Sequence, residues 1–189
     1  MNIDFFRATT YGGFQKASHF QVEIHAPSKV GMMPGTNAAG HMYVRECNIP
    51  GRNMATSEIK YGTAPTTKQV YNSIPADFTV TFICDAGMEL FSYFKKWQDI
   101  IHNPVTGVLS YPDDYKGTVV VNAMDTLGSV RYTHTMYNAF PENVADISMS
   151  YSDDQFATFQ VTFSYTESTT SNTSGIVQAL LNRFGGSGL

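Results

Sequence analysis

Apolar and polar residues alternate over several short segments of this chain. Alternation with a period of two is typical of strands in a sheet with one dry and one wet face. The two clearest segments, Ala76–Ile83 and Phe156–Tyr165, alternate aromatic and aliphatic residues with Thr, Gln and Ser. Further strands are expected at residues 20–24, 41–48, 118–123, 130–138 and 144–151. Short connections between the later strands, including a turn at residues 140–143, predict antiparallel pairing.

One segment repeats its apolar residues at helical spacing instead. It spans residues 86–102, and its apolar residues at intervals of three or four are Leu90, Phe94, Trp97 and Ile101. This stripe covers one face of a helix, so it predicts packing against a core rather than an aromatic ligand box. Asp85 is expected to cap the start of the helix, and Asn103-Pro104 to end it.

Three segments fall outside this pattern. Residues 1–17 are polar and contain Gly12-Gly13, so we expect an arm that is flexible or docked on a partner. Residues 51–73 form a long connection, which is either a functional loop or an extended hairpin that leaves the body. Residues 166–174 are rich in Ser and Thr and are expected to be a linker. A short amphipathic helix follows, and it needs a surface to dock on.

Together these elements predict a mainly β fold with a minor α component. We expect an antiparallel β-barrel or sandwich with one packed helix at about residues 86–102, plus a C-terminal tail helix. The expected organisation is an arm at residues 1–17, a domain at 18–166 that includes the loop 51–73, and a linker with a tail helix at 167–189. A chain of 189 residues is long enough to bury a core without a disulfide or a metal.

Composition indicates a protein that associates with itself. Apolar residues make up 42% of the chain, but charged residues only 15%, well below the usual share of about 25%. The net charge of −4 argues against a protein that grips nucleic acid, because such proteins carry a basic stripe. Residues 1–103 contain nine basic and eight acidic residues, whereas residues 104–189 contain three and eight. This division is either chance or a sign of complementary surfaces that meet between copies.

The residues that could support catalysis or metal binding show no pattern typical of an enzyme. The five histidines have no metal-ligand spacing: they are His19, His25, His41, His102 and His134. We expect His134, in mid-strand, to be a hydrogen-bonded structural residue, and Cys47 and Cys84 to be reduced core thiols. The adjacent acids Asp113-Asp114 and Asp153-Asp154 are expected to form turns rather than a glycosidase pair.

The chain begins without a signal-peptide pattern and has no apolar run of membrane-spanning length. We therefore predict no catalytic residues, no cofactor, no metal and no membrane partner.

Seven landmarks, taken in order, carry a resemblance to a known family. They are Phe20–Ile24, Cys47–Gly51, Lys68–Tyr71 with Asp77–Phe82, Phe94–Ile100, Tyr115–Gly117, Ala139–Val144 and Phe156–Tyr165. In this order they resemble the tail tube proteins of contractile-tailed bacteriophages, which are similar to the tubes of contractile injection systems. The resemblance covers about residues 18–166.

The resemblance implies a structural protein of the virion tail, assembled in the host cytoplasm. In the family, a small β-barrel or sandwich with one helix forms six-fold rings, which stack into a tube inside a sheath. The genome passes through the tube. The expected partners are therefore further copies of the chain, sheath and baseplate proteins, and DNA that passes through the lumen without specific binding.

The resemblance also gives roles to particular residues. The wet strand faces lack Lys and Arg, so we expect them to line the lumen, with these residues: Asp77, Thr79, Thr81, Asp146, Thr158, Gln160, Thr162 and Ser164. The loop at 51–73 is expected to reach a neighbouring ring through Arg52, Ile59, Lys60, Tyr61 and Lys68. The tail helix is expected to dock on an adjacent subunit or the sheath through Ile176, Val177, Leu180, Leu181 and Phe184.

Several alternatives remain open from the sequence. The wet strand faces are equally consistent with the solvent side of a two-layer fold. The family's chains stop soon after the last strand, but this one continues with a tail helix, so it is a main tube subunit or a baseplate or tube-initiator paralogue. A tube of a contractile injection system is a further alternative. A β-sandwich module that binds a carbohydrate or peptide through its loops belongs to a different class.

Overall fold

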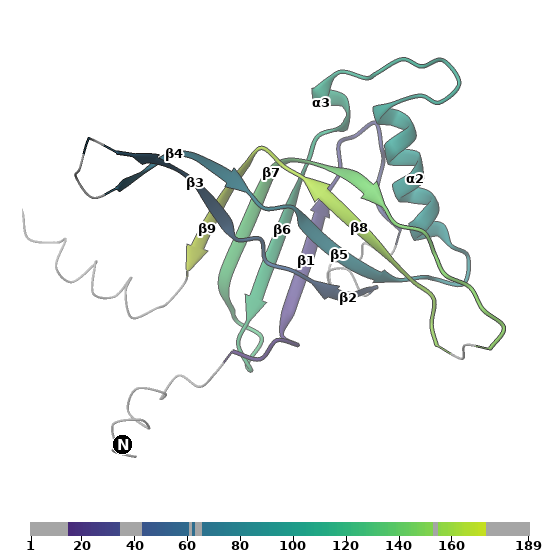
Figure 1. Ribbon diagram of the computed structural model, residues 1–189. Helices are drawn as coiled ribbons and strands as arrows, with labels where there is room; N and C mark the ends of the chain where they lie inside the picture. Colours follow the sequence, from purple (N-terminus) through teal and green to yellow (C-terminus); the bar gives the residue numbers. More distant parts are fainter. Residues whose placement is uncertain (1–14, 35–42, 61, 63–65, 153–154, 173–189) are drawn as a thin grey trace, which may run out of the picture.

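The computed structural model describes residues 15–34, 43–60, 62, 66–152 and 155–172. Figure 1 shows these residues folded mainly into antiparallel strands, with one long helix packed at one end. The strands are β1 (Phe20–His25), β2 (Val44–Cys47), β3 (Arg52–Ile59), β4 (Thr67–Pro75), β5 (Phe78–Ile83), β6 (Gly117–Met124), β7 (Val130–Val144), β8 (Thr158–Ser164) and β9 (Glu167–Asn172). The helices are α2 (Glu89–Ile101) and the short α3 (Pro112–Tyr115).

The long strand β7 joins two sheets. Its N-terminal part pairs with β6 and β9, and β1 extends this first sheet next to β6. Its C-terminal part pairs with β8, and β5 and β2 complete the second sheet. Asn138 stands at the change of partners with a φ of 56°, in the left-handed region that Asn adopts more readily than most residues. The two sheets therefore form a sandwich-like arrangement that shares one strand, and the described strands do not close into a barrel (Figure 1).

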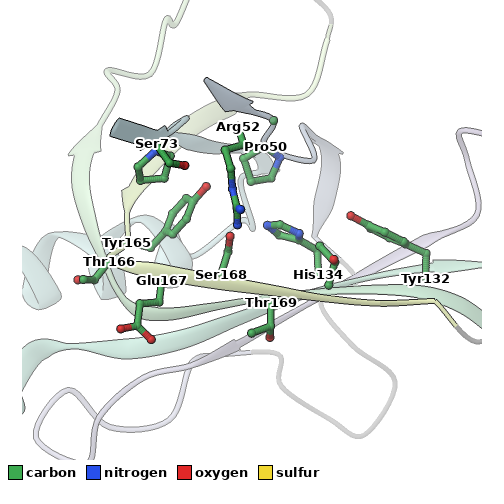
Figure 2. Close-up of a pocket in the computed structure, with 13 residues that line it drawn as sticks. Pro50, Arg52, Ser73, Tyr132, His134, Tyr165, Thr166, Glu167, Ser168 and Thr169 are labelled. Carbon is green, nitrogen blue, oxygen red and sulfur yellow. The ribbon is translucent and has the colours of Figure 1, made fainter. Parts of the chain in front are cut away.

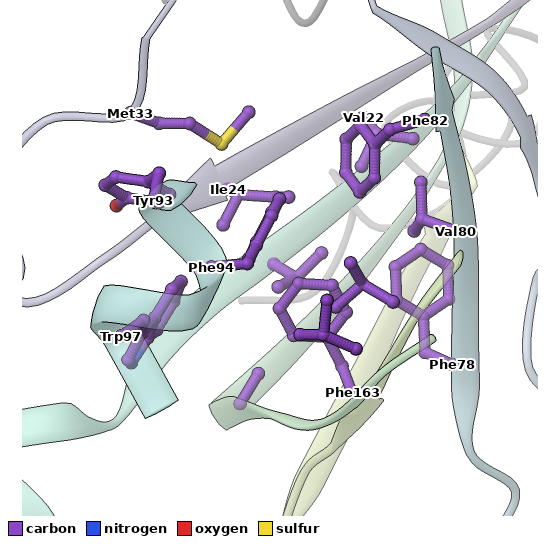
Figure 3. Packing of buried hydrophobic residues seen from close by; sticks show 14 of the residues in the cluster. Val22, Ile24, Met33, Phe78, Val80, Phe82, Tyr93, Phe94, Trp97 and Phe163 are labelled. Carbon is purple, nitrogen blue, oxygen red and sulfur yellow. The ribbon is translucent and has the colours of Figure 1, made fainter. Parts of the chain in front are cut away.

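Aromatic side chains from the second sheet fill the core between the sheets. Phe78, Val80 and Phe82 alternate along β5 and are fully buried. They lie opposite the β8 residues Phe163, Val161 and Phe159, respectively. The first sheet supplies Val22, Ile24, Val119, Val121 and Met136. Figure 3 shows how these aliphatic and aromatic groups meet beside α2. The alternation that predicted strands 76–83 and 156–165 is confirmed by this burial pattern.

Helix α2 closes one end of this core. Leu90, Phe94 and Trp97 are buried as predicted, and the Trp97 Nε1–H donates a hydrogen bond of 2.8 Å to the carbonyl oxygen of Tyr115. The helix begins at Glu89, three residues later than predicted, with Met88 as its N-cap residue. Asp85 still satisfies the helix start, because its carboxylate accepts hydrogen bonds from the backbone N–H groups of residues 89 and 90 at 3.0 and 3.2 Å.

The C-terminal half differs from the sequence prediction in two places. Residues 140–143 are not a turn but part of β7, and residues 145–150 are not in a strand. A register shift between Pro141 and Asn143 accommodates the proline, which has no N–H to donate to the ladder. Residues 167–172, expected as a linker, form β9 on the free edge of β7. Local composition did not show this pairing, because it depends on a distant strand.

The connection at 51–73 is an extended hairpin, which was one of the two predicted forms. Among the strands that the structure describes, β3 and β4 pair only with each other, and they project from the body in Figure 1. The expected tail helix, Tyr61 and most of the expected N-terminal arm lie outside the described residues.

Candidate functional site

The wet face of the second sheet is the first candidate site. Thr79 lies opposite Thr162, and Thr81 lies opposite Gln160 across the β5–β8 pair. Their chain neighbours Phe78, Val80 and Phe82 point into the core, so the threonines point to the other face. Thr158 and Ser164, at the ends of β8, lie on this same face, opposite Ile83 of β5 and Phe140 of β7.

The two acidic residues predicted for this face stand at its borders. Asp77 immediately precedes β5, and Asp146 follows the end of β7; both are exposed. The backbone N–H of Ala145 donates to the carbonyl oxygen of Gln160 at 2.8 Å, which holds the start of the following loop beside β8. The structure thus brings the strand residues together on one face, with one carboxylate at each of two edges.

Strand register adds two residues that the sequence did not single out. Glu46 of β2 lies opposite Thr81, and Asn143 of β7 lies opposite Thr162. Glu46 was placed in a predicted strand, but only the pairing of β2 with β5 assigns it to this face. Asn143 was assigned to a turn. Strands β5 and β8 contain no Lys or Arg, so this wet face offers hydroxyl, amide and carboxylate groups without a cation from its two central strands.

The β3–β4 hairpin is the second candidate site. Its exposed apolar side chains are Met54, Val70 and Tyr71, an arrangement that is uncommon on a free strand pair and typical of contact surfaces. The Lys68 Nζ lies 3.5 Å from the carboxylate Oε1 of Glu58 on the facing strand, which forms an ion pair. Ile59 and Lys60 lie at the far end of β3, beside the turn of the hairpin. Arg52 lies at the opposite end, where the hairpin leaves the body, so the predicted stacking residues do not form one cluster.

A cavity of about 570 Å³ lies between the base of the hairpin and the edge formed by β7 and β9. Figure 2 shows Arg52 entering it from β3, with His134 and Ser168 facing it from β7 and β9. The side chains of Glu167 and Thr169 point away to the other face of the sheet (Figure 2). Sequence reasoning did not find this cavity, because its walls combine the β3–β4 hairpin with β7 and β9, which are distant from the hairpin along the chain.

His134 is the most unusual residue of this cavity. It is buried, with 4% relative exposure. The predicted hydrogen bond is wrong: neither Nδ1 nor Nε2 has a partner within the described part of the structure. Burial, and secondarily the nearby Arg52, lowers the pKa of the imidazole from its usual value. The ring stacks on Tyr132 with a centroid distance of 6.4 Å.

Other reactive groups form no centre within the described residues. Cys47 and Cys84 are free and half-buried. Burial, and to a smaller extent Glu46, raises the pKa of the Cys47 thiol to about 11, so the thiol is protonated and a poor nucleophile at neutral pH. Over residues 15–34, 43–60, 62, 66–152 and 155–172, no His, Cys, Asp and Glu side chains gather in a way that would hold a metal ion. In the same part of the chain no helix has the length and apolar character needed to cross a membrane.

Comparison with known proteins places the chain in a family. The sequence model described as "Phage tail tube protein" matches residues 15–171. No curated protein matches the sequence significantly.

Solved structures share the fold at low sequence identity. The cap of the anti-feeding prophage, described as its tube terminating cap, superposes with a TM-score of 0.64 at 15% identity, covering 85% of this chain and 92% of that one. The anti-feeding prophage baseplate gives a TM-score of 0.63 at 11% identity, covering 86% and 99%. The sheath–tube complex of an extracellular contractile injection system, PVC, gives 0.59 at 13%, covering 88% and 97%. The chain belongs to the phage tail tube protein family, and its fold is that of tube-like structural proteins of contractile injection systems.

Proposed function

We propose that this protein is the subunit of a phage tail tube, in which six copies form a ring and stacked rings enclose a lumen that conducts DNA during ejection. The observation that carries this proposal is the wet face of β5 and β8. In a member of the tail tube family, two central strands present a registered row of threonine, glutamine and serine without a cation.

The chemistry of this face suits a passage for DNA. Each contact between a phosphate and a Lys or Arg releases counterions and adds affinity, which slows transit. Thr79, Thr81, Thr162 and Gln160 hydrogen-bond water and carry no charge, and Asp77 and Asp146 add weak repulsion at the borders. A lumen lined in this way excludes tight binding while staying wet.

Free strand edges support closure into a ring. Within the described residues, β1 and β2 end the strand order, and β9 has a single strand partner. Such edges are templates for pairing with another chain. Pairing between copies joins the sheets into one wide barrel, whose diameter grows with the number of strands.

The hairpin and the loops supply further contacts in this proposal. The β3–β4 hairpin projects from the body with exposed Met54, Val70 and Tyr71, so it is placed to reach the next ring. Other exposed apolar residues lie in the loops after α2 and β7: Val105, Val108, Leu109, Tyr111, Met149, Tyr151 and Phe156. We assign these loops to contacts with sheath or baseplate proteins. On this account the protein is a structural component of the virion tail, assembled in the host cytoplasm, without a catalytic role.

A specialised role at one end of the tube is the second candidate. The family match ends at residue 171, whereas the chain continues to residue 189. The expected amphipathic helix in this extension provides an extra docking element for a baseplate or tube-initiator paralogue. Deletion of residues 173–189 separates the two roles. A main subunit still forms long tubes without the extension, whereas an initiator loses its attachment to the baseplate.

Negative-stain electron microscopy of the purified protein tests the proposal. We expect rings with six-fold symmetry or filaments built from them. Featureless monomers at high protein concentration would contradict the tube assignment and favour the β-sandwich binding module. A variant with Glu at both Met54 and Val70 is expected to leave single rings but to prevent stacking, because it places charges on the apolar surface of the hairpin.

A further inference from the structure

The cavity under the hairpin has the electrostatic character of an anion site. Arg52 is the cation whose side chain enters it (Figure 2). Among the described residues Arg52 forms no ion pair. The acidic residue in the cavity wall, Glu167, directs its carboxylate to the opposite face of the sheet (Figure 2). The interior therefore carries an uncompensated positive charge.

Neutral donors surround this charge. Tyr165 and Ser168 direct their hydroxyl groups toward Arg52 in Figure 2. Burial raises the pKa of the Tyr165 hydroxyl; the hydrogen bond with Ser168 and the charge of Arg52 lower it, and the charge of Asp77, an acid outside the wall, raises it. Asp77 does not form an ion pair with Arg52 within the described residues. A guanidinium with adjacent hydroxyl donors matches the geometry of a carboxylate, which accepts several hydrogen bonds on two oxygens.

His134 is an independent sign that a polar ligand belongs here. Its ring is 4% exposed, it faces the cavity, and both of its nitrogens are without a protein partner in the described chain. Buried polar atoms are almost always hydrogen-bonded, because an unsatisfied one costs about 1–3 kcal/mol. An acceptor in the cavity satisfies one ring N–H of His134 and the Arg52 guanidinium together.

We propose that this cavity binds a carboxylate group between Arg52 and His134, and that in the assembled tube an acidic side chain of a second copy supplies it. This choice of source rests on the proposed tube function. It is supported by the charge division of the chain, in which residues 104–189 hold eight acidic and three basic residues. Glu142 of that half is exposed, and its carboxylate forms no ion pair within the described residues.

Binding at this site is coupled to the protonation of His134. In the free subunit, burial and the Arg52 charge lower the pKa of this imidazole. A bound carboxylate favours the imidazolium and raises that pKa, so carboxylate affinity increases as the pH falls. The titratable groups that face His134 across the cavity are Arg52 and Tyr165, and Tyr132 stacks on its ring.

Acetate titration of the unassembled subunit tests the cavity without relying on tube formation. The His134 imidazole resonances in ¹H–¹³C NMR spectra, assigned by their loss in His134→Gln, are followed at constant ionic strength with chloride as the other anion. We expect a saturable shift and a rise in the His134 pKa. Arg52→Gln is expected to weaken acetate binding about tenfold. Lys68→Gln, which removes a cation of the same hairpin outside the cavity, leaves the affinity unchanged.

Assembled tubes without added carboxylate test the source. If a second copy supplies the group, the His134 signal of tubes resembles that of the acetate-bound subunit, and Arg52→Gln returns it to the free position. An acetate-insensitive His134 in the subunit overturns the binding site, whether or not tubes form. A sensitive subunit with a free-type signal in tubes shows that the site takes small free carboxylates and overturns the second-copy source. Failure to form tubes while acetate still binds counts against the proposed function and not against the cavity.

Discussion

Two lysines on the wet face of β5 and β8 are expected to slow DNA passage without disturbing the fold. Thr79 and Thr162 lie opposite each other in register, are only partly buried and point away from the core. Their replacement by Lys in a double variant places two like charges side by side, which costs about 0.2–1 kcal/mol. A native domain tolerates a loss of this size, so tubes should still assemble.

The expected effect on DNA follows from counterion release. Each Lys–phosphate contact releases about 0.9 counterion, which multiplies the binding constant by about five at 0.15 M salt, or about 1 kcal/mol. Four simultaneous contacts hold the duplex about a thousandfold more tightly. Raising the salt to 0.5 M weakens each contact about threefold. Ejection from virions that carry the variant is therefore expected to be slow at low salt and to recover partly at high salt.

Dye-detected DNA release from triggered virions measures this effect. The matched control is the double variant Ser92→Lys with Ser129→Lys, which adds the same charge at exposed positions of α2 and of the turn between β6 and β7. The control is expected to eject DNA at the unmodified rate. Normal, salt-independent ejection from fully assembled Thr79→Lys/Thr162→Lys virions would refute the assignment of this face to the lumen.

Three further predictions concern the stability of the unassembled subunit. Trp97→Phe loses the hydrogen bond to the Tyr115 carbonyl and part of a buried ring, so urea unfolding should show a loss of about 2–4 kcal/mol; a loss below about 1 kcal/mol contradicts the packing. Gly117→Ala places a Cβ against the His25 carbonyl oxygen and should cost about 1–3 kcal/mol, whereas Gly51→Ala, with open space around it, should cost little. His134 has a lowered folded-state pKa, so the unfolded chain binds the proton more readily and stability falls as the pH drops below about 6.5; this slope should shrink in His134→Gln.

The strand and helix patterns near the core were readable from the sequence because they are local. Alternation along residues 78–83 and 158–164 reports burial on one face directly, and both strands appear where they were predicted. The stripe that contains Phe94 and Trp97 likewise gives the buried face of α2. These patterns arise from the period of each element, so they need no knowledge of the partner.

The features that the sequence missed depend on partners that are distant along the chain. Strand β9 is a polar Ser/Thr-rich segment, and it becomes a strand only because β7 offers a free edge. The turn predicted around Pro141 is wrong because the register shift in β7 absorbs the proline. The cavity at His134 arises where the hairpin base passes over the β7–β9 edge. Positions on the wet face were predicted, but their alignment and the addition of Glu46 come from strand register.

A cryo-electron microscopy reconstruction of the assembled particle tests the central claim most directly. The account predicts a six-fold tube in which the face that carries Thr79, Thr81, Gln160 and Thr162 lines a continuous lumen. A reconstruction in which this face lies on the outer wall, or is buried between subunits, would contradict the account.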